Sequence, residues 1–335
     1  MDEILDITET IELKDEIIDI DDEIVDVKQD TSLDEFSILK RYGEILTNKE
    51  YITDPAIERD SEIKKVMLTL FTPEKSPILV GKPGIGKTAI VEGLAYRIKN
   101  NMVPEALKNN KIIKINTVAM VGNISKDGNS EQKLNLLVEE LEKLEKTILF
   151  IDETHTLIGN KENGGLDFAN ILKPALSRGN VKMIGATTTN EYDYFILKDK
   201  AFVRRLEKIE IQEPNEETTV KILMGSLPKI MKKTNISVNY SNFVIENIMK
   251  FIVNMTSEYN RILETASRYP DVCFLVLTKA FSFAIMDNSK ELKFKHIWEA
   301  VSTSEVVYPD VLKKHKEIFK KTFEQELEKE NVYLH

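Results

Sequence analysis

Between Asp54 and Gln212 the apolar residues fall into short runs that alternate with longer amphipathic stretches. The short runs have the length of buried strands. They lie at 77–81, 112–116, 147–152, 181–186 and 208–211. The stretches between them, at about 60–71, 87–100, 130–145 and 167–178, have apolar residues at helical spacing. This alternation predicts an α/β fold, in which a parallel sheet is covered by helices on both faces.

From Pro214 onward the apolar positions keep a helical spacing, without a strong strand pattern. We therefore predict that an α/β domain at 36–213 is followed by a separate, smaller α-helical lid domain at 214–310. Residues 311–332 are rich in Lys and Glu. The last segment, 311–335, is therefore expected to be one exposed, charged helix.

The first 35 residues form a chemically distinct segment. They hold 15 Asp and Glu against two Lys, a net charge of −13, whereas the whole chain carries −10. The other 300 residues therefore carry +3. We expect a disordered acidic tail at 1–35. The alternative is a docking segment that orders on a partner, because apolar residues recur there at helical spacing, at Leu13, Ile17, Ile20, Ile24 and Val27.

Composition and charge exclude several classes of protein. With 335 residues, 42% of them hydrophobic and 30% charged, the chain has the composition of a globular protein. The lone Cys273 excludes a disulfide framework and fits a reducing compartment. The acidic first residues exclude a signal peptide, and no apolar run approaches the roughly 18 residues of a membrane span, so a cytoplasmic protein is expected. A charge of +3 without a dense Lys/Arg stripe argues against nucleic-acid binding.

One loop predicts the chemistry. Residues 81–88 read Gly-Lys-Pro-Gly-Ile-Gly-Lys-Thr, a G-x-x-x-x-G-K-T phosphate-binding loop between a predicted strand and a predicted helix. Its glycines allow backbone N–H groups to surround phosphate oxygens, and the helix N-terminus adds a partial positive charge. Lys87 is expected to reach the β- and γ-phosphates of ATP, and Thr88 to hold Mg²⁺. The alternative is a tight turn with an incidental Lys-Thr pair.

A second motif concerns hydrolysis. The apolar run at 147–151 ends in two carboxylates, Asp152 and Glu153. Asp152 is expected to hold Mg²⁺ together with Thr88, and Glu153 to polarise the attacking water as a general base. Both motifs follow predicted strands of one parallel sheet, and ligands of such sheets bind at the carboxyl ends of the strands. The two motifs together predict a Mg²⁺-dependent ATPase.

Further stretches resemble one family. They lie at 39–43, 54–60, 81–95, 152–156, 169–179 and 184–188. Together they resemble the first ATPase domain of the Clp-type AAA+ unfoldases and disaggregases, the group of ClpA, ClpB and ClpC, over about residues 39–310. The resemblance implies a single AAA+ core with a helical lid, ATP and Mg²⁺ as cofactors, and assembly of several copies into a hexameric ring.

The resemblance also implies roles for single residues. Thr188 is similar to the sensor-1 residue, a polar side chain between the γ-phosphate and Glu153. Arg204 and Arg205 fall where the family has arginine fingers, which act on nucleotide held by a neighbouring subunit. The adenine-side segment at 54–60 departs from the family at Glu58, where Gly is usual. The residues expected to bind nucleotide are Ile57, Gly81, Pro83, Gly84, Ile85, Gly86, Lys87, Thr88, Ala89 and Asp152.

The chain departs from the family at the pore loop that grips polypeptide. The family has a Tyr between basic residues in this loop, and an ungapped alignment puts Lys126 at that position. A hydrated ammonium does not pack against varied side chains as an aromatic ring does. The resemblance therefore supports threading of polypeptide through a pore only weakly, with Ile124 as an alternative gripping residue.

Three functions stay open. The leading one is a Clp-like ATPase, working as a ring, that remodels, moves or assembles a protein partner. The second is a nucleotide-gated binding or assembly module that does not thread polypeptide, which Lys126 favours. The third is an AAA+ helper in DNA transactions, and the near-neutral charge of residues 36–335 argues against it.

Overall fold

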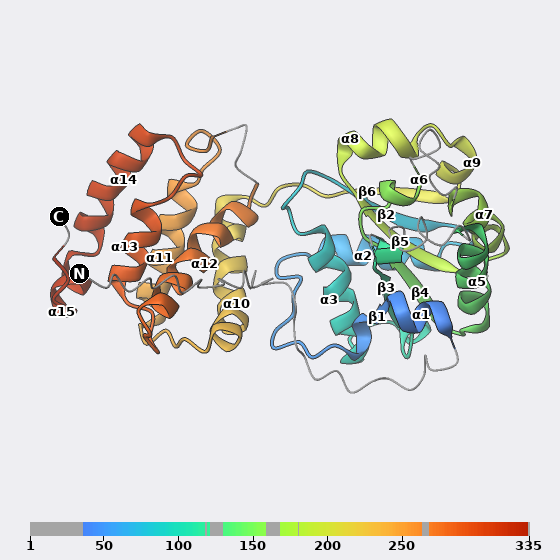
Figure 1. The fold of residues 1–335 in the computed structure, drawn as a ribbon, viewed down its shortest axis with the longest axis horizontal. Helices are drawn as coiled ribbons and strands as arrows, with labels where there is room; N and C mark the ends of the chain where they lie inside the picture. The colour runs from blue at the N-terminus through green and yellow to red at the C-terminus, as the bar shows by residue number, and fades with distance from the viewer. Residues whose placement is uncertain are drawn as a thin grey trace, which may run out of the picture.

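The computed structural model describes residues 36–117, 119–120, 130–158, 168–179, 181–262 and 268–333. Two bodies lie side by side along the long axis of the molecule, a sheet with its helices and an all-helical body (Figure 1). The acidic segment 1–35 and the predicted pore-loop residues Ile124 and Lys126 lie outside the described residues.

The sheet contains six strands among the described residues. They are β1 (Gly43–Ile45), β2 (Ser76–Val80), β3 (Lys111–Ile115), β4 (Thr147–Ile151), β5 (Lys182–Thr187) and β6 (Leu206–Glu210). Their order across the sheet is β1-β3-β4-β5-β2-β6. β1 is antiparallel to β3, and the other neighbours are parallel. The mostly parallel α/β core predicted from the sequence is therefore confirmed, and the carboxyl ends of β2, β4 and β5 meet at one edge.

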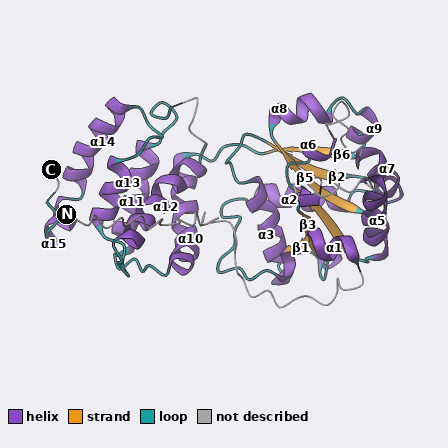
Figure 2. Ribbon diagram, in the orientation of Figure 1, coloured by secondary structure: helices purple, strands orange, loops and turns teal. Residues whose placement is uncertain are grey.

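Alternate residues of the central strands enter two hydrophobic clusters, one on each face of the sheet. On β4, Leu149 and Ile151 belong to one cluster, and Ile148 and Phe150 to the other. Because both faces are buried, residues 148–151 of β4 are all apolar, which is why the sequence reveals this strand so clearly. The covering helices are α1 (Ser37–Tyr42), α5 (Ser130–Lys143) and α7 (Phe168–Arg178) on the first face, and α2 (Asp60–Phe71) and α3 (Lys87–Lys99) on the second (Figure 2).

Short elements connect these layers. They include 3₁₀ turns at Leu46–Asn48 and Glu105–Leu107, α6 (His155–Ile158), α8 (Thr189–Glu191), a π-helical turn at Tyr192–Ile196, and α9 (Lys200–Val203). α6 follows the end of β4, and α8 follows the end of β5. Two of these one-turn helices therefore begin at the edge of the sheet where ligands are expected.

The all-helical body has its own hydrophobic cluster, in which every buried residue comes from Val220 or later in the chain. Its helices are α10 (Glu216–Thr234), α11 (Asn242–Met255), α12 (Asp271–Met286), α13 (Phe294–Ser302), α14 (Pro309–Thr322) and α15 (Glu324–Lys329). Separate clusters are consistent with a domain boundary near residue 213, and the division into domains at 36–213, 214–310 and 311–335 stays a prediction.

The C-terminal segment differs from the single exposed helix expected for it. Two helices, α14 and α15, form there. Their Phe319, Phe323 and Leu327 are buried in the cluster of the helical body, and Phe319 and Phe323 both contact the ring of Phe251. The spacing of four residues between these three side chains gives one apolar face, which the high Lys and Glu content obscures in the sequence.

Candidate nucleotide-binding site

The predicted phosphate loop joins the end of β2 to the start of α3. Gly84 and Gly86 have φ angles of +75° and +92°, which only glycine adopts without strain. Gly86 is the residue before α3, so the loop delivers the N-terminus of that helix to the sheet edge. Ile85 is buried beneath the loop, whereas Pro83 is exposed. The conformation is the one that phosphate binding by backbone N–H groups requires.

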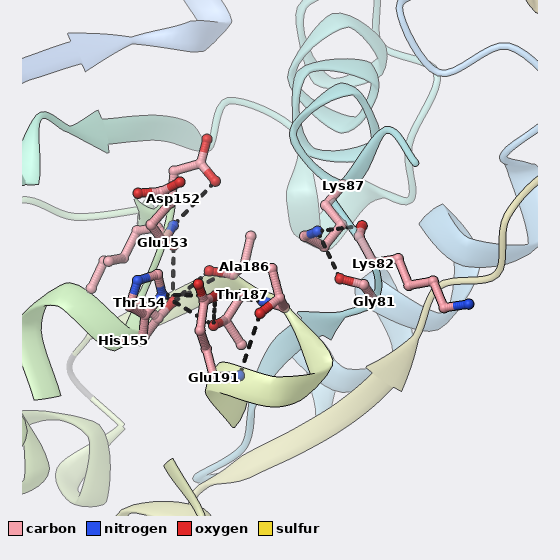
Figure 3. Close-up of polar contacts among 12 residues, drawn as sticks. Gly81, Lys82, Lys87, Asp152, Glu153, Thr154, His155, Ala186, Thr187 and Glu191 are labelled. Carbon is pink, nitrogen blue, oxygen red and sulfur yellow. Dashed lines mark hydrogen bonds and ion pairs between the residues drawn. The ribbon is translucent and has the colours of Figure 1, made fainter. Parts of the chain in front are cut away.

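Lys87, the first residue of α3, turns back over this loop. Its Nζ donates hydrogen bonds to the carbonyl oxygens of Gly81 and Lys82, both at 2.9 Å (Figure 3). Burial lowers the pKa of Lys87, and the nearby carboxylates, led by Asp152, act against that shift. The ammonium is thus already held at the loop, where phosphate oxygens could replace the carbonyl acceptors.

The structure brings Thr88 and Asp152 together. The Thr88 Oγ1 donates to Asp152 Oδ2 at 2.9 Å, although the two residues are 64 positions apart. Asp152 Oδ1 accepts from the backbone N–H of Glu153 at 3.2 Å. Hydroxyl and carboxylate oxygens are ligands that Mg²⁺ prefers, so this pair fits the predicted metal.

Glu153 lies exposed at the end of β4, with a φ of +49°. The next residue, Thr154, is buried and fastens this turn to β5. Its N–H donates to the carbonyl oxygen of Ala186 at 2.8 Å, and its Oγ1 accepts from the N–H of Ala186 at 3.1 Å (Figure 3). A side chain that water can reach is therefore carried on a turn that is fixed to the sheet, as a general base requires.

Thr188 is the N-cap of α8. Its Oγ1 accepts from the N–H of Glu191 at 3.3 Å, and Glu191 Oε2 accepts from the N–H of Thr188 at 2.9 Å. Glu191 Oε2 also accepts from Thr187 Oγ1 at 3.1 Å and lies 3.0 Å from His155 Nδ1. Burial opposes ionisation of Glu191, but the hydrogen bonds from Thr188 and Thr187 and the neighbouring His155 outweigh it and lower its pKa.

His155 and Glu191 are site residues that the sequence analysis missed. Together they join the turn after β4, which carries Glu153, to the turn after β5, which carries Thr188. The Thr-x-x-Glu spacing of a capping box was a signal in the sequence for Glu191. His155 had no such signal, because its partner lies 36 residues away in the chain.

Arg204 and Arg205 lie at the far end of the sheet from the phosphate loop. The carbonyl oxygen of Arg205 accepts from the N–H of Ser76, the first residue of β2, at 2.9 Å. The phosphate loop begins after Val80, the last residue of that strand. Four residue steps of a strand span roughly 13 Å, so the structure does not bring these arginines to the Lys87 and Thr88 of their own chain.

The two arginines also differ in their surroundings. Arg204 is exposed. The Arg205 guanidinium is held within its own chain, where its Nε donates to Ser177 Oγ and its Nη1 to the carbonyl oxygen of Ala201 at 2.6 Å. Of the two, Arg204 is the one free to reach another molecule.

The adenine-side segment bridges the two bodies. A side chain at Gly225 of α10 would come within 2.5 Å of Ile57 Cδ1, and Thr53 Oγ1 donates to the carbonyl oxygen of Gly225 at 3.2 Å. Glu58 takes the left-handed conformation, with a φ of +58°. That conformation explains why glycine is usual at this position in the resembling family. Lys221 of α10 lies 3.4 Å from the Glu58 carboxylate.

A second contact joins the helical body to the phosphate loop itself. A Cβ added to Gly84 would lie 2.8 Å from the Cβ of Asp271, the first residue of α12. The chain between the bodies is anchored as well, because Glu213 Oε1 accepts from Arg261 Nη1 at 2.8 Å and from the N–H of Tyr269 at 2.9 Å. The helical body thus contacts the candidate site at both its base side and its phosphate side.

One residue near the carboxylates was not expected from the sequence. Lys114 of β3 puts its Nζ 3.4 Å from Asp152 Oδ2, the oxygen that also accepts from Thr88. A cation therefore lies directly beside the predicted metal ligand.

Comparisons with known proteins agree with this geometry. Residues 77–213 match the model of the ATPase family associated with various cellular activities (AAA). The chaperone protein ClpB of Aquifex aeolicus is 38% identical over 258 residues, 76% of this chain and 25% of that protein. ClpB of Bacteroides thetaiotaomicron is 45% identical over 204 residues, 59% of this chain and 24% of that protein. The chain thus spans about a quarter of the length of these relatives.

Solved structures give the same result. A closed-state reconstruction of Hsp104 with ATPγS and FITC casein superposes with a TM-score of 0.67 at 29% identity, covering 89% of this chain and 54% of that chain. The S. cerevisiae Hsp104–ADP complex superposes with a TM-score of 0.65 at 35% identity, covering 78% of this chain and 44% of that chain. In the part of this chain that the structure describes, no helix is long and apolar enough to cross a membrane.

Proposed function

We propose that this chain uses Mg²⁺ and ATP to remodel, move or assemble a protein partner as a ring of copies. The premise is that it belongs to the Clp-type AAA+ ATPases, enzymes that hydrolyse ATP. The single observation that carries the proposal is the hydrogen bond between Thr88 and Asp152, with Lys87 and Glu153 beside them. The resemblance to ClpB and to Hsp104 bound to casein supports a protein as the partner.

Binding of the nucleotide rests on the phosphate loop and the helical body. Lys87 would exchange its carbonyl acceptors for phosphate oxygens, and the N–H groups around Gly84 and Gly86 would surround the phosphates. Ile57 would contact the base where α10 approaches it. Thr88 and Asp152 would hold Mg²⁺, which when bound neutralises charge on the β- and γ-phosphates.

Hydrolysis rests on the turns after β4 and β5. Glu153 would take a proton from the water that attacks the γ-phosphorus, while the bond to the bridging oxygen breaks. Thr188 would orient the γ-phosphate or that water through its remaining hydrogen-bonding capacity, because its hydroxyl already accepts from Glu191. Arg204 would act on nucleotide bound by a neighbouring copy, which is consistent with its exposure and its distance from Lys87.

The work on a partner would come from the two contacts between the bodies. Asp271 meets the phosphate loop, and Gly225 meets Ile57. A change of the nucleotide between them would alter both contacts and so rotate the helical body against the sheet. We retain the proposed division into an α/β domain at 36–213 and a lid at 214–310 on this ground.

The test uses the Glu153→Gln variant. We expect it to keep ATP binding and to lose about 10²- to 10⁴-fold of the turnover, as removal of a general base does. Its solution mass, measured by light scattering, should rise to that of several chains with ATP and fall without it. Glu145→Gln, a control at the opposite end of β4, should behave as the unmodified chain. Unchanged turnover in Glu153→Gln would exclude Glu153 as the base, and a monomer under both conditions would exclude the ring.

A second candidate function is a nucleotide-gated module that does not thread polypeptide, and Lys126 at the pore-loop position favours it. The two candidates differ in one measurable activity. Threading requires that a stably folded, tagged protein be unfolded in the presence of ATP. A gated module would bind its partner in a nucleotide-dependent manner and leave such a protein folded.

A further inference from the structure

Lys114 extends from β3 toward the carboxylates that end β4. In the register of the two strands Lys114 is opposite Phe150, two residues before Asp152. Its Nζ lies 3.4 Å from Asp152 Oδ2 and 5.8 Å from the centre of the Phe150 ring. The ammonium thus lies over the ring face and next to one carboxylate oxygen.

That oxygen already has a donor. Asp152 Oδ2 accepts from Thr88 Oγ1 at 2.9 Å. The hydroxyl of Thr88 and the ammonium of Lys114 therefore both approach the same oxygen of Asp152, a residue that would hold Mg²⁺. The side chains of Lys114 and Asp152 are 32% and 26% exposed. The pair is therefore only partly screened by water, and its interaction is stronger than that of a fully exposed ion pair.

We propose that Lys114 competes with Mg²⁺ for Asp152 and thereby sets how strongly Mg²⁺ enhances nucleotide binding. The inference rests on the proposed function of the site. A carboxylate that neutralises an ammonium attracts a divalent cation less, and the ammonium itself repels that cation. Without Mg²⁺ the same ammonium partly offsets the charge of the phosphates, so nucleotide alone binds better than it otherwise would.

The measurable quantity is the magnesium enhancement, the ratio of the Kd of a fluorescent ADP analogue in excess EDTA to its Kd in excess MgCl₂. ADP is chosen because it is not hydrolysed, so binding is read without turnover. Lys114→Met keeps the stem over Phe150 and removes the charge, and Lys114→Arg keeps the charge. Lys111→Met removes a charge from the amino end of the same strand, where Lys111 pairs with Thr147, and serves as the matched control.

We expect Lys114→Met to raise the magnesium enhancement about tenfold, close to the effect of one unit charge on another at this distance in bulk water and well below the effect near a protein surface. Lys114→Arg and Lys111→Met should leave the ratio at the value of the unmodified chain. Thermal unfolding of each variant checks that it is folded, and Lys114→Gln provides a second neutral side chain if the Met variant is not.

Two results would overturn the inference while leaving the proposed function intact. One is a magnesium enhancement in the neutral variants equal to that of the unmodified chain. The other is a magnesium enhancement that falls in the neutral variants, which would mean that the ammonium supports Mg²⁺ binding and does not compete with it. If the unmodified chain bound no ADP under either condition, the proposed function would fail and the role of Lys114 with it.

Discussion

At the scale of single residues, the Glu191 side chain connects two turns of the candidate site. One of its oxygens accepts from the N–H of Thr188 and from Thr187 Oγ1, and it lies 3.0 Å from His155 Nδ1. It therefore ties the turn after β4 to the turn after β5. Since the pKa of Glu191 is lower in the folded chain than its usual value of 4.5, ionisation of Glu191 and folding favour each other.

Glu191→Gln tests this coupling. Gln can still complete the capping box, so the variant removes the charge and keeps the geometry. We expect a loss of about 1 kcal/mol in the free energy of unfolding at neutral pH, roughly the difference between a hydrogen bond to a charged acceptor and one to a neutral acceptor. The stabilisation from a lowered carboxyl pKa is fully present above the unfolded-state value and disappears as pH falls through the folded-state value.

The measurement is urea unfolding from pH 7 to pH 3. The difference between the unmodified chain and Glu191→Gln should shrink below about pH 4.5, where the unfolded-state carboxyl protonates. Glu207→Gln, which removes an exposed charge on β6, is the matched control. A difference that stays constant across this range would contradict the charge-based account.

The residues that the sequence did reveal belong to local motifs. Lys87, Thr88, Asp152 and Glu153 were predicted because each lies in a short run that ends a strand or begins a helix. Lys114 was not, because its role depends on β3 lying beside β4 in the sheet. The local sequence of neither strand predicts that the two strands lie side by side.

At the scale of elements, α12 meets the phosphate loop at Gly84. A Cβ on Gly84 would lie 2.8 Å from the Cβ of Asp271, and its φ of +75° already disfavours any other residue. Gly179 has a similar φ of +72° but no heavy atom within 4 Å of an added Cβ. Comparing substitutions at these two glycines therefore distinguishes the cost of backbone strain from the cost of the contact with α12.

Gly84→Ala and Gly179→Ala use this difference. Both should lose about 1–2 kcal/mol in the free energy of unfolding from the left-handed conformation. Gly84→Ala should lose more than that and also weaken ATP binding, because its methyl group pushes against Asp271. Adding Asp271→Gly to Gly84→Ala should recover the extra loss. The measurement is urea unfolding. Equal losses in the free energy of unfolding of the two single variants would show that α12 moves to accommodate the methyl group without destabilising the fold.

The elements also show where prediction from sequence stops. Runs buried on both faces, such as β4, stand out because they are continuously apolar. β1 was missed because it spans three residues, Gly43–Ile45, at the antiparallel edge of the sheet. The burial of the C-terminal segment was missed because the one buried residue of α15, Leu327, sits among charged neighbours. Short elements are stabilised by contacts with distant residues, which local patterns do not record.

At the scale of the whole molecule, the exposure of Arg204 and its distance from the phosphate loop of its own chain are consistent with the proposed action between copies. Arg204→Ala should keep ATP binding and stability and lose about 10³-fold of turnover, as removal of an arginine finger does. Arg205→Ala should also lose stability, because it breaks the hydrogen bonds to Ser177 and Ala201. ATP turnover and thermal unfolding distinguish the two variants.

A mixing experiment tests the direction of action. Lys87→Ala keeps Arg204 but loses the phosphate-binding ammonium, so neither it nor Arg204→Ala should turn over ATP alone. A mixture of the two should regain part of the activity, since the arginine of one copy can serve the nucleotide of the other. Full activity of Arg204→Ala alone would end its role as a finger. Absence of recovery in a mixture that assembles would contradict action of Arg204 on the nucleotide of a neighbouring copy.

Because β2 lies between Arg204 and the phosphate loop of the same chain, the proposed action of Arg204 on a neighbouring copy would make the behaviour of the protein depend on its abundance. A solitary copy would hold ATP and leave it intact, since the Arg204 that completes the reaction would belong to another copy. The rate of ATP hydrolysis would then rise more steeply than the concentration of the protein. Dilution would stop hydrolysis reversibly. At a low concentration of the protein, ATP would therefore be bound and not hydrolysed.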